Sequence, residues 1–312
     1  SIQLAWINEN IERLSYAEAI TLGAGEGFLT VQRYLSPYTD RIFARLERSA
    51  LSEADRLQYI QQWHNYLRSA GRSSEADDAL RTIEIAYGPR PEEWVRAFLY
   101  WDGLEEPARV AADQLIESVG SEGPLVWSDN ARQACYLELW RLRQGDLSQT
   151  TSIVERLRAG ADDPNPAHGR NALCALTLEV ILADKTGSLE ARELIQRLVD
   201  VHDEGPSRPL AIVAWSGLEL AWILEERGEV EAGARVVRYN STPRVNPFSF
   251  AMSSVNREAG RLNDLAGDYA RALQFYRSFV LARGSADSRL SDEVESIVSR
   301  ITELEAELDQ RR

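Results

Sequence analysis

Glycine-centred turns recur at regular intervals along this 312-residue chain, and they constrain its fold more than any other feature. Longer loops rich in proline and polar residues, such as residues 161–169 and 203–209, fall between these turns. A short turn that alternates with a long loop, at a period of roughly 20–50 residues, is typical of stacked helical hairpins. The turns are separated by 32, 42, 42, 41 and 39 residues and centre on Gly71, Gly103, Gly145, Gly187, Gly228 and Gly267.

Between the turns, the apolar residues follow the period of an α-helix. They recur at steps of three and four, whereas runs of alternating β-branched residues, which indicate strands, hardly occur. We therefore predict an all-α protein. One example of the helical spacing is formed by Leu57, Ile60, Trp63 and Leu67.

The last hairpin, residues 256–276, has the most specific pattern. Small residues, Gly260 and Ala272, stand where two helices cross closely, and Tyr269 and Tyr276 fill the space around the crossing. The order Ala-Gly, then Gly-Asp-Tyr at the turn, then Ala-x3-Tyr resembles a tetratricopeptide repeat (TPR). The stretch 266–280 is also similar to the C-terminal repeats of many bacterial multidomain regulators.

The resemblance extends over Ser253–Ala286 and, more weakly, over Ala214–Asn240, where Ala221 and Gly233 take the small positions. Residues 63–80 follow it in part, and the hairpins in between depart from it. It implies a right-handed α-solenoid of TPR-like hairpins over residues 51–286. Helices within residues 1–50 would cap one end, and a long helix within residues 287–312 would cap the other.

The two ends of the chain carry further patterns. Near the N-terminus, the glycine-rich segment 23–27 is interpreted as a loop or helix break, because no strand precedes it as a dinucleotide site requires. Near the C-terminus, a heptad pattern predicts either a helix that caps the last repeat or a coiled coil that makes a homodimer. The heptad positions are Leu290, Val294, Ile297, Ile301, Leu304 and Leu308.

Charge excludes several classes of function. Lys and Arg total 35 against 49 Asp and Glu, so the net charge is −14, and a general nucleic-acid binder needs the opposite balance. Lys185 is the single lysine and no glycine precedes it, which excludes a Walker A phosphate-binding loop.

Candidate catalytic and metal-binding residues are few, and each has a simpler interpretation. His64, His168 and His202 lie far apart and show no metal-ligand spacing, so surface or packing roles are expected. Cys135 follows Gln-Ala as in one protease family, but the next residues continue a helical pattern. The chain has two cysteines, too few for a disulfide framework. Carboxylate pairs, including Asp77/Asp78 and Glu225/Glu226, are interpreted as solvated faces. We expect no catalytic residue, metal or cofactor.

The TPR resemblance implies a groove that binds an extended peptide or a partner helix. Certain positions on the first helix of each hairpin face this groove in such repeats. Arginine forks there can hold a carboxylate, and tryptophan supplies contact area. When the hairpins are aligned on their turns, the positions that correspond to this groove are Gln58, Gln61, Asn65 and Arg68; Arg132, Cys135 and Arg143; Trp215, Trp222 and Glu225; and Arg257 and Arg261.

Three functions stay open at this stage. The first is a non-catalytic scaffold or adaptor that binds a protein or peptide partner. The second is a regulatory or sensor portion of a larger signalling or transcription protein, and the third is an all-α glycan-binding protein or glycoside hydrolase. The start of the chain lacks a signal-peptide pattern and the longest apolar stretch is too short to span a bilayer, so we expect a cytoplasmic protein without membrane insertion. Because the first residue is Ser1, we expect a processed chain or a piece of a longer one.

Overall fold

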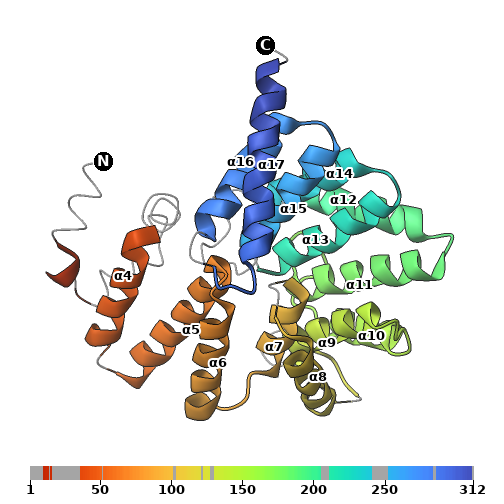
Figure 1. The fold of residues 1–312 in the computed structure, drawn as a ribbon. Helices are drawn as coiled ribbons and strands as arrows, with labels where there is room; N and C mark the ends of the chain where they lie inside the picture. Colours follow the sequence, from red (N-terminus) through yellow and green to blue (C-terminus); the bar gives the residue numbers. More distant parts are fainter. Residues whose placement is uncertain are drawn as a thin grey trace. The chain divides into compact units, whose positions relative to one another are not determined.

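The computed structural model describes residues 10–13, 15, 36–50, 52–100, 103–120, 122–126, 130–204, 211–240, 252–283 and 286–310 (Figure 1). All elements of regular structure in these ranges are helices, which confirms the all-α prediction. The glycine-rich segment 23–27 and most of the expected N-terminal cap lie outside the described residues. The helices are η1 (Ile11–Arg13), α4 (Ser36–Ser49), α5 (Glu53–Ala70), α6 (Ser73–Tyr87), α7 (Pro91–Tyr100), α8 (Glu105–Val119), α9 (Arg132–Arg143), α10 (Thr150–Ala159), α11 (Arg170–Thr186), α12 (Ala191–Glu204), α13 (Ala211–Glu226), α14 (Val230–Asn240), α15 (Met252–Leu265), α16 (Tyr269–Ala282) and α17 (Ser291–Gln310).

The predicted glycine turns join these helices. Five of the six turn glycines have a positive φ, a left-handed backbone that ends a helix and that residues with a Cβ rarely adopt. Gly103 is the exception. Its N–H donates to the carbonyl of Ala97 at 3.0 Å, and a Cβ at this position would lie 2.6 Å from the Ala97 carbonyl carbon. Gly103 therefore serves close packing against the end of α7 rather than a left-handed turn.

The residues fall into two compact units, which are described separately. One comprises Ser1–Pro89, Asn246–Arg257 and Leu273–Arg312, and the other comprises Arg90–Val245 and Glu258–Ala272. The division runs through α15 and α16.

In the unit that contains Arg90–Val245, helices pack in a repeating order. Helix α7 packs on α8, α11 on α12 and α13 on α14, while α7 contacts α9, α9 contacts α11 and α11 contacts α13. Gly233 of α14 approaches Ala221 of α13 so closely that a Cβ would lie 3.1 Å from the Ala221 carbonyl oxygen. The predicted small positions of this hairpin thus lie at a close helix crossing, and the architecture is repeat-like.

In the unit that contains Ser1–Pro89, aromatic side chains of α4 and α5 pack against one another. The ring of Phe43 lies 5.0 Å from that of Trp63 and 5.3 Å from that of Tyr66, measured between centroids. Phe43 and Tyr66 are buried. Such pairs stabilise packing beyond the apolar area that they bury.

The same unit brings together two segments that are far apart in the sequence. The Asp287 N–H donates to the carbonyl of Gly71 at 3.0 Å, and the N–H and hydroxyl of Ser74 donate to the Asp287 carboxylate at 3.0 and 3.2 Å. The C-terminal segment thus contacts the first hairpin as well as α16.

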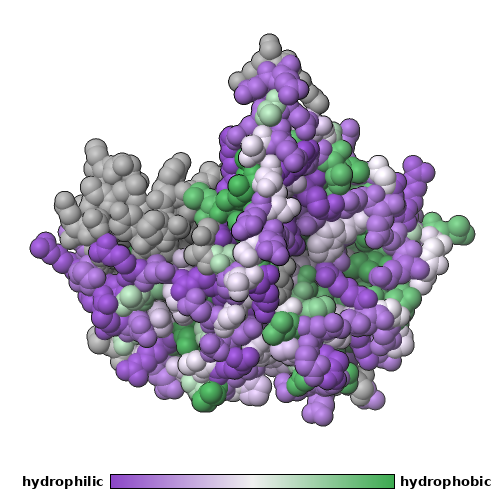
Figure 2. Space-filling model, in the orientation of Figure 1, coloured by the Kyte–Doolittle hydropathy of each residue, from purple (hydrophilic) through white to green (hydrophobic). Residues whose placement is uncertain are grey.

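Helix α17 buries only part of its heptad seam. Leu290 and Leu304 are buried, whereas Val294, Ile297 and Ile301 are half-buried. Figure 2 shows a mainly hydrophilic surface along the side of α17 on view. Both interpretations of the heptad pattern, the cap and the homodimer, stay open.

The contact between the α5–α6 turn and the C-terminal segment predicts the effect of Gly71→Ala. A Cβ at Gly71 would lie 2.9 Å from the Ala286 Cβ and 3.0 Å from the Arg283 Cδ. Gly187 is a matched control. Its φ of 64° is close to the 73° of Gly71, but a Cβ added at Gly187 would have nothing within 4 Å. We expect Gly71→Ala to reduce the free energy of unfolding by about 1–2 kcal/mol more than Gly187→Ala does, measured by urea unfolding. Equal losses would show that the close approach has no energetic consequence.

Candidate functional site

The predicted groove residues do not form one open surface. On α5, Gln58 is exposed and Gln61 is half-buried, but Asn65 and Arg68 are buried. Trp215 on α13 is only 2% exposed, so its assignment to an open groove is wrong. The apolar neighbours on its own helix explain this, since α13 is buried on nearly all sides.

Arg68 has a structural partner instead of an external one. Its guanidinium donates to the Asp77 carboxylate at 2.5 Å and to His64 Nε2 at 3.3 Å. The Arg68 side chain is fully buried and that of Asp77 is 7% exposed. The expectation that Asp77 and Asp78 both lie on a solvated face is therefore wrong for Asp77, because a buried charge requires a partner of opposite sign.

Cys135 is likewise not a groove residue. It is 1% exposed and forms a disulfide with Cys174, which joins α9 to α11. The two Cα atoms lie 6.3 Å apart, within the ordinary range for disulfides.

Several of the remaining groove candidates meet in one cluster within the unit that contains Arg90–Val245. It combines side chains from α7, α9, α13 and α15; three of its seven members are buried, three are half-buried and one is exposed. We call it the arginine–tryptophan cluster; it comprises Tyr100, Arg143, Glu219, Trp222, Glu225, Glu258 and Arg261.

Arg143 is the centre of one half of this cluster. Its guanidinium donates to Glu219 at 2.7 Å and to the carbonyl of Leu99 at 3.1 Å. It also lies over the ring of Trp222, 4.9 Å from the centroid, in a cation–π contact. Burial and the neighbouring Glu219, to which Tyr100 donates at 2.9 Å, raise the pKa of Tyr100 well above its ordinary value.

Arg261 is the centre of the other half. It holds Glu225 with both terminal nitrogens, at 2.6 and 2.5 Å, and donates to Glu258 at 2.9 Å. Trp222 donates to the same Glu258 at 3.2 Å. The hydrogen bonds from Arg261 lower the pKa of Glu225. Three glutamates thus face two arginines in the cluster, and the predicted arginine clamps already hold carboxylates of this chain.

The two other predicted arginines are engaged in the same way, outside the cluster. Arg132 pairs with Glu92 at 2.6 Å, and Arg257 pairs with Glu293 at 2.6 Å. The partners are separated by 40 and 36 residues, and the pairs Glu225–Arg261 and Trp222–Glu258 are each separated by 36. These separations fall within the 32–42 residues between successive turn glycines. Each contact joins α7 to α9, α13 to α15 or α15 to α17. In the sequence, oppositely charged residues about one repeat period apart are the signal that could have revealed these ion pairs.

His202 has a packing role, one of the two roles expected for the histidines. It lies in the last turn of α12, is fully buried, and its Nε2 lies 3.2 Å from the Ser216 hydroxyl, which in turn lies 2.7 Å from that of Thr177. This arrangement of a serine beside a histidine has no access to solvent, so it is a packing feature and not a nucleophile. Burial lowers the pKa of His202 from 6.5 to about 4, against a smaller opposing effect of Asp203.

This burial predicts a dependence of stability on pH. The folded protein keeps His202 neutral down to about pH 4, whereas the unfolded chain binds a proton below about pH 6.5, so stability decreases as the pH falls through that window. Between about pH 7.5 and pH 5 we expect wild type to lose about 2 kcal/mol more than His202→Gln, measured by urea unfolding. His168→Gln, which removes an exposed histidine, should behave as wild type. Equal pH dependence in wild type and His202→Gln would contradict this prediction.

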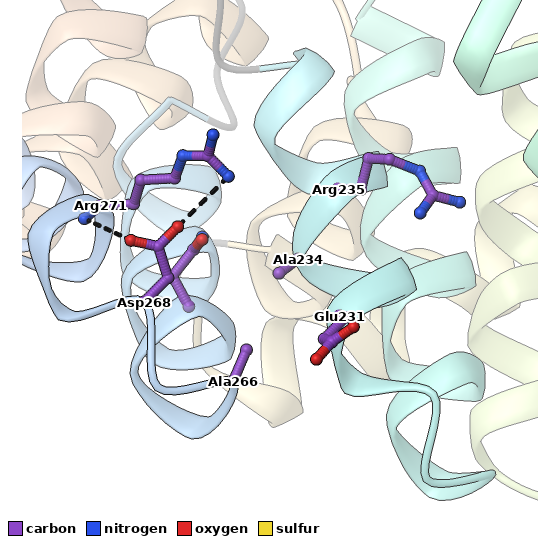
Figure 3. A pocket seen from close by; sticks show the side chains of 7 residues that line it. Glu231, Ala234, Arg235, Ala266, Asp268 and Arg271 are labelled. Atoms are coloured by element: carbon purple, nitrogen blue, oxygen red, sulfur yellow. Dashed lines mark hydrogen bonds and ion pairs between the residues drawn. The ribbon is translucent and has the colours of Figure 1, made fainter.

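A shallow pocket of about 330 Å³ lies between α14 and the turn that joins α15 to α16 (Figure 3). Arg235 and Arg271 lie on opposite sides of it, and Figure 3 shows Arg271 bound to Asp268. Arg235 pairs with Asp203 at 3.1 Å. None of the predicted groove residues lines this pocket, and its exposed ion pairs do not define a ligand.

Among the described residues, no helix is both long and apolar enough to cross a membrane. The same part of the chain contains no group of three or more His, Cys, Asp or Glu that could hold a metal ion. Comparison with protein families, curated proteins and solved structures gives no match.

Proposed function

We propose that this chain is a non-catalytic scaffold or adaptor, a right-handed α-solenoid of TPR-like hairpins that binds a partner protein or peptide. The observation that carries the proposal is the arginine–tryptophan cluster. It gathers aromatic rings and guanidinium groups, the side chains that contribute most to protein interfaces, from α7, α9, α13 and α15.

The α13–α15 edge of the cluster is accessible, as is Arg143 of α9, whose side chain is 30% exposed. The Arg261 and Glu225 side chains are 37% and 28% exposed, and Trp222 is half-buried beside them. Helices of this kind hold extended peptides or partner helices through such mixed apolar and polar positions. We therefore assign this edge as the centre of the binding face.

The charges of the cluster favour a basic partner. Because Glu225 and Glu258 already engage the Arg261 guanidinium, an incoming carboxylate would have to displace one of them. Lys or Arg of a partner would instead find an excess of carboxylates, on a chain whose net charge is −14. This revises the expectation that the arginines clamp acidic groups of the partner.

The test is affinity capture with variants of the proposed face. We expect Trp222→Ala and Glu225→Gln each to reduce recovery of the specific partner about tenfold, because hot-spot residues contribute at least 1–2 kcal/mol to binding. Arg277→Gln is the matched control, since it breaks an exposed ion pair with Glu305 that involves no residue of the cluster, and it should leave recovery unchanged. Circular dichroism and thermal unfolding identify any variant that fails to fold. Folded variants that bind as wild type would exclude this face.

A further inference from the structure

We propose that Cys135 and Cys174 form a permanent structural disulfide, which this chain acquires while it folds in an oxidising environment. The proposal does not depend on the binding function. The sequence led us to expect a cytoplasmic protein; a permanent disulfide instead requires an oxidant where the chain folds.

The pairing is unambiguous because the full sequence contains two cysteines. They are separated by 39 residues, close to the period that separates Thr177 from Ser216 and the charge pairs of neighbouring hairpins. Cys135 and Cys174 lie 10 and 13 residues before the turn glycines Gly145 and Gly187, an offset of about one helical turn. They are on α9 and α11, two first helices that contact each other. The packing of α9 against α11 brings the two sulfur atoms together.

Burial determines when the bond can form. Cys135 is 1% exposed and Cys174 is fully buried, with Leu139 and Leu178 among the buried residues of the same two helices. Apolar burial disfavours the thiolate, which is the form that attacks a disulfide. The folded, reduced protein would consequently oxidise slowly, so the bond forms before α11 has docked fully on α9.

The chemistry requires an external oxidant. The two thiols lose two protons and two electrons as the sulfur–sulfur bond forms. The electrons reduce a disulfide of the oxidant, such as oxidised glutathione or a disulfide-carrying oxidoreductase, to two thiols. Disulfides of this kind persist mainly in oxidising compartments.

The bond also lies where the repeat pattern is weakest. The hairpins around Gly145 and Gly187 lack the small residues that allow close helix crossing in the last two hairpins. Those small residues serve the crossing of two helices within a hairpin. The disulfide adds a covalent link of another kind, between the first helices of two hairpins.

The first test measures protection of the bond in the folded chain. Dithiothreitol should reduce the full-length native protein at least about a hundredfold more slowly than the protein unfolded in guanidinium, because attack requires local opening. Thiols are counted with a maleimide reagent, and Cys174→Ala, which retains Cys135 as a single thiol, shows that the reagent reports a buried thiol only after unfolding. Equal rates of reduction in the native and unfolded protein would overturn the permanent cross-link.

The second test concerns when and where the bond forms. Oxidised glutathione should oxidise the unfolded, reduced chain as it refolds but react slowly with chain that was folded in the reduced state. In the cells that make this protein, acid quenching followed by maleimide labelling should find the oxidised form predominant. Rapid oxidation of the folded, reduced protein would contradict formation during folding, and a reduced chain in those cells would contradict the oxidising environment.

Discussion

Replacement of Asp77 by alanine is expected to lower the free energy of unfolding by about 3–5 kcal/mol. The reason is that the variant leaves the fully buried Arg68 guanidinium without the carboxylate that lies 2.5 Å from it. Most of the expected loss in the free energy of unfolding comes from the Arg68 charge that remains, because water cannot reach it, and less comes from the lost attraction itself. Urea unfolding of purified variants measures the loss.

The neighbouring residue provides the control for this prediction. Asp78 lies on the same helix and also pairs with an arginine, Arg81, but both side chains of that pair are more than half exposed. We expect Asp78→Ala to change stability by less than about 0.5 kcal/mol. If the two alanine variants have similar stability, burial of the Arg68–Asp77 pair does not determine its energetic contribution.

Loss of the Cys135–Cys174 bond is expected to lower the free energy of unfolding by about 3–4 kcal/mol, because the unfolded chain gains the freedom of a loop of about 39 residues. The measurement compares oxidised wild type with the Cys135→Ala/Cys174→Ala variant in guanidinium unfolding. Reduced wild type is the matched control, since it keeps both side chains and separates the effect of the bond from that of packing. A difference below about 1 kcal/mol between oxidised and reduced wild type would show that the bond does not stabilise the fold.

The helices and most of their turns could be predicted from the sequence because they depend on local physics. A left-handed glycine such as Gly187 ends a helix whatever lies around it, and five of the six predicted turns have this conformation. The close approach of Ala221 and Gly233 was predicted from small residues at a repeat position. Gly103 also lies between two helices as predicted, but there the glycine allows close packing against Ala97 at the end of α7.

The candidate site was less predictable, because it depends on which side chains of neighbouring hairpins meet. A TPR-like alignment assigns Arg143 and Arg261 to a groove but cannot show that Glu219 and Glu225 already hold them. The adjacent carboxylates Asp77 and Asp78 were both interpreted as a solvated face, but only Asp78 is exposed. Comparison of residues one repeat period apart would have paired Glu225 with Arg261 and Cys135 with Cys174.

The central claim is that the α13–α15 edge of the arginine–tryptophan cluster binds a partner, and site-specific photocross-linking tests it most directly. A photoreactive phenylalanine analogue is placed at Glu225 in the cells that make this protein, with Glu117, an exposed residue of α8, as the control position. We expect light to give one discrete adduct from position 225 and none from position 117, and the adduct should disappear when Trp222→Ala is added. No adduct from position 225, or the same adduct from both positions, would contradict the binding face.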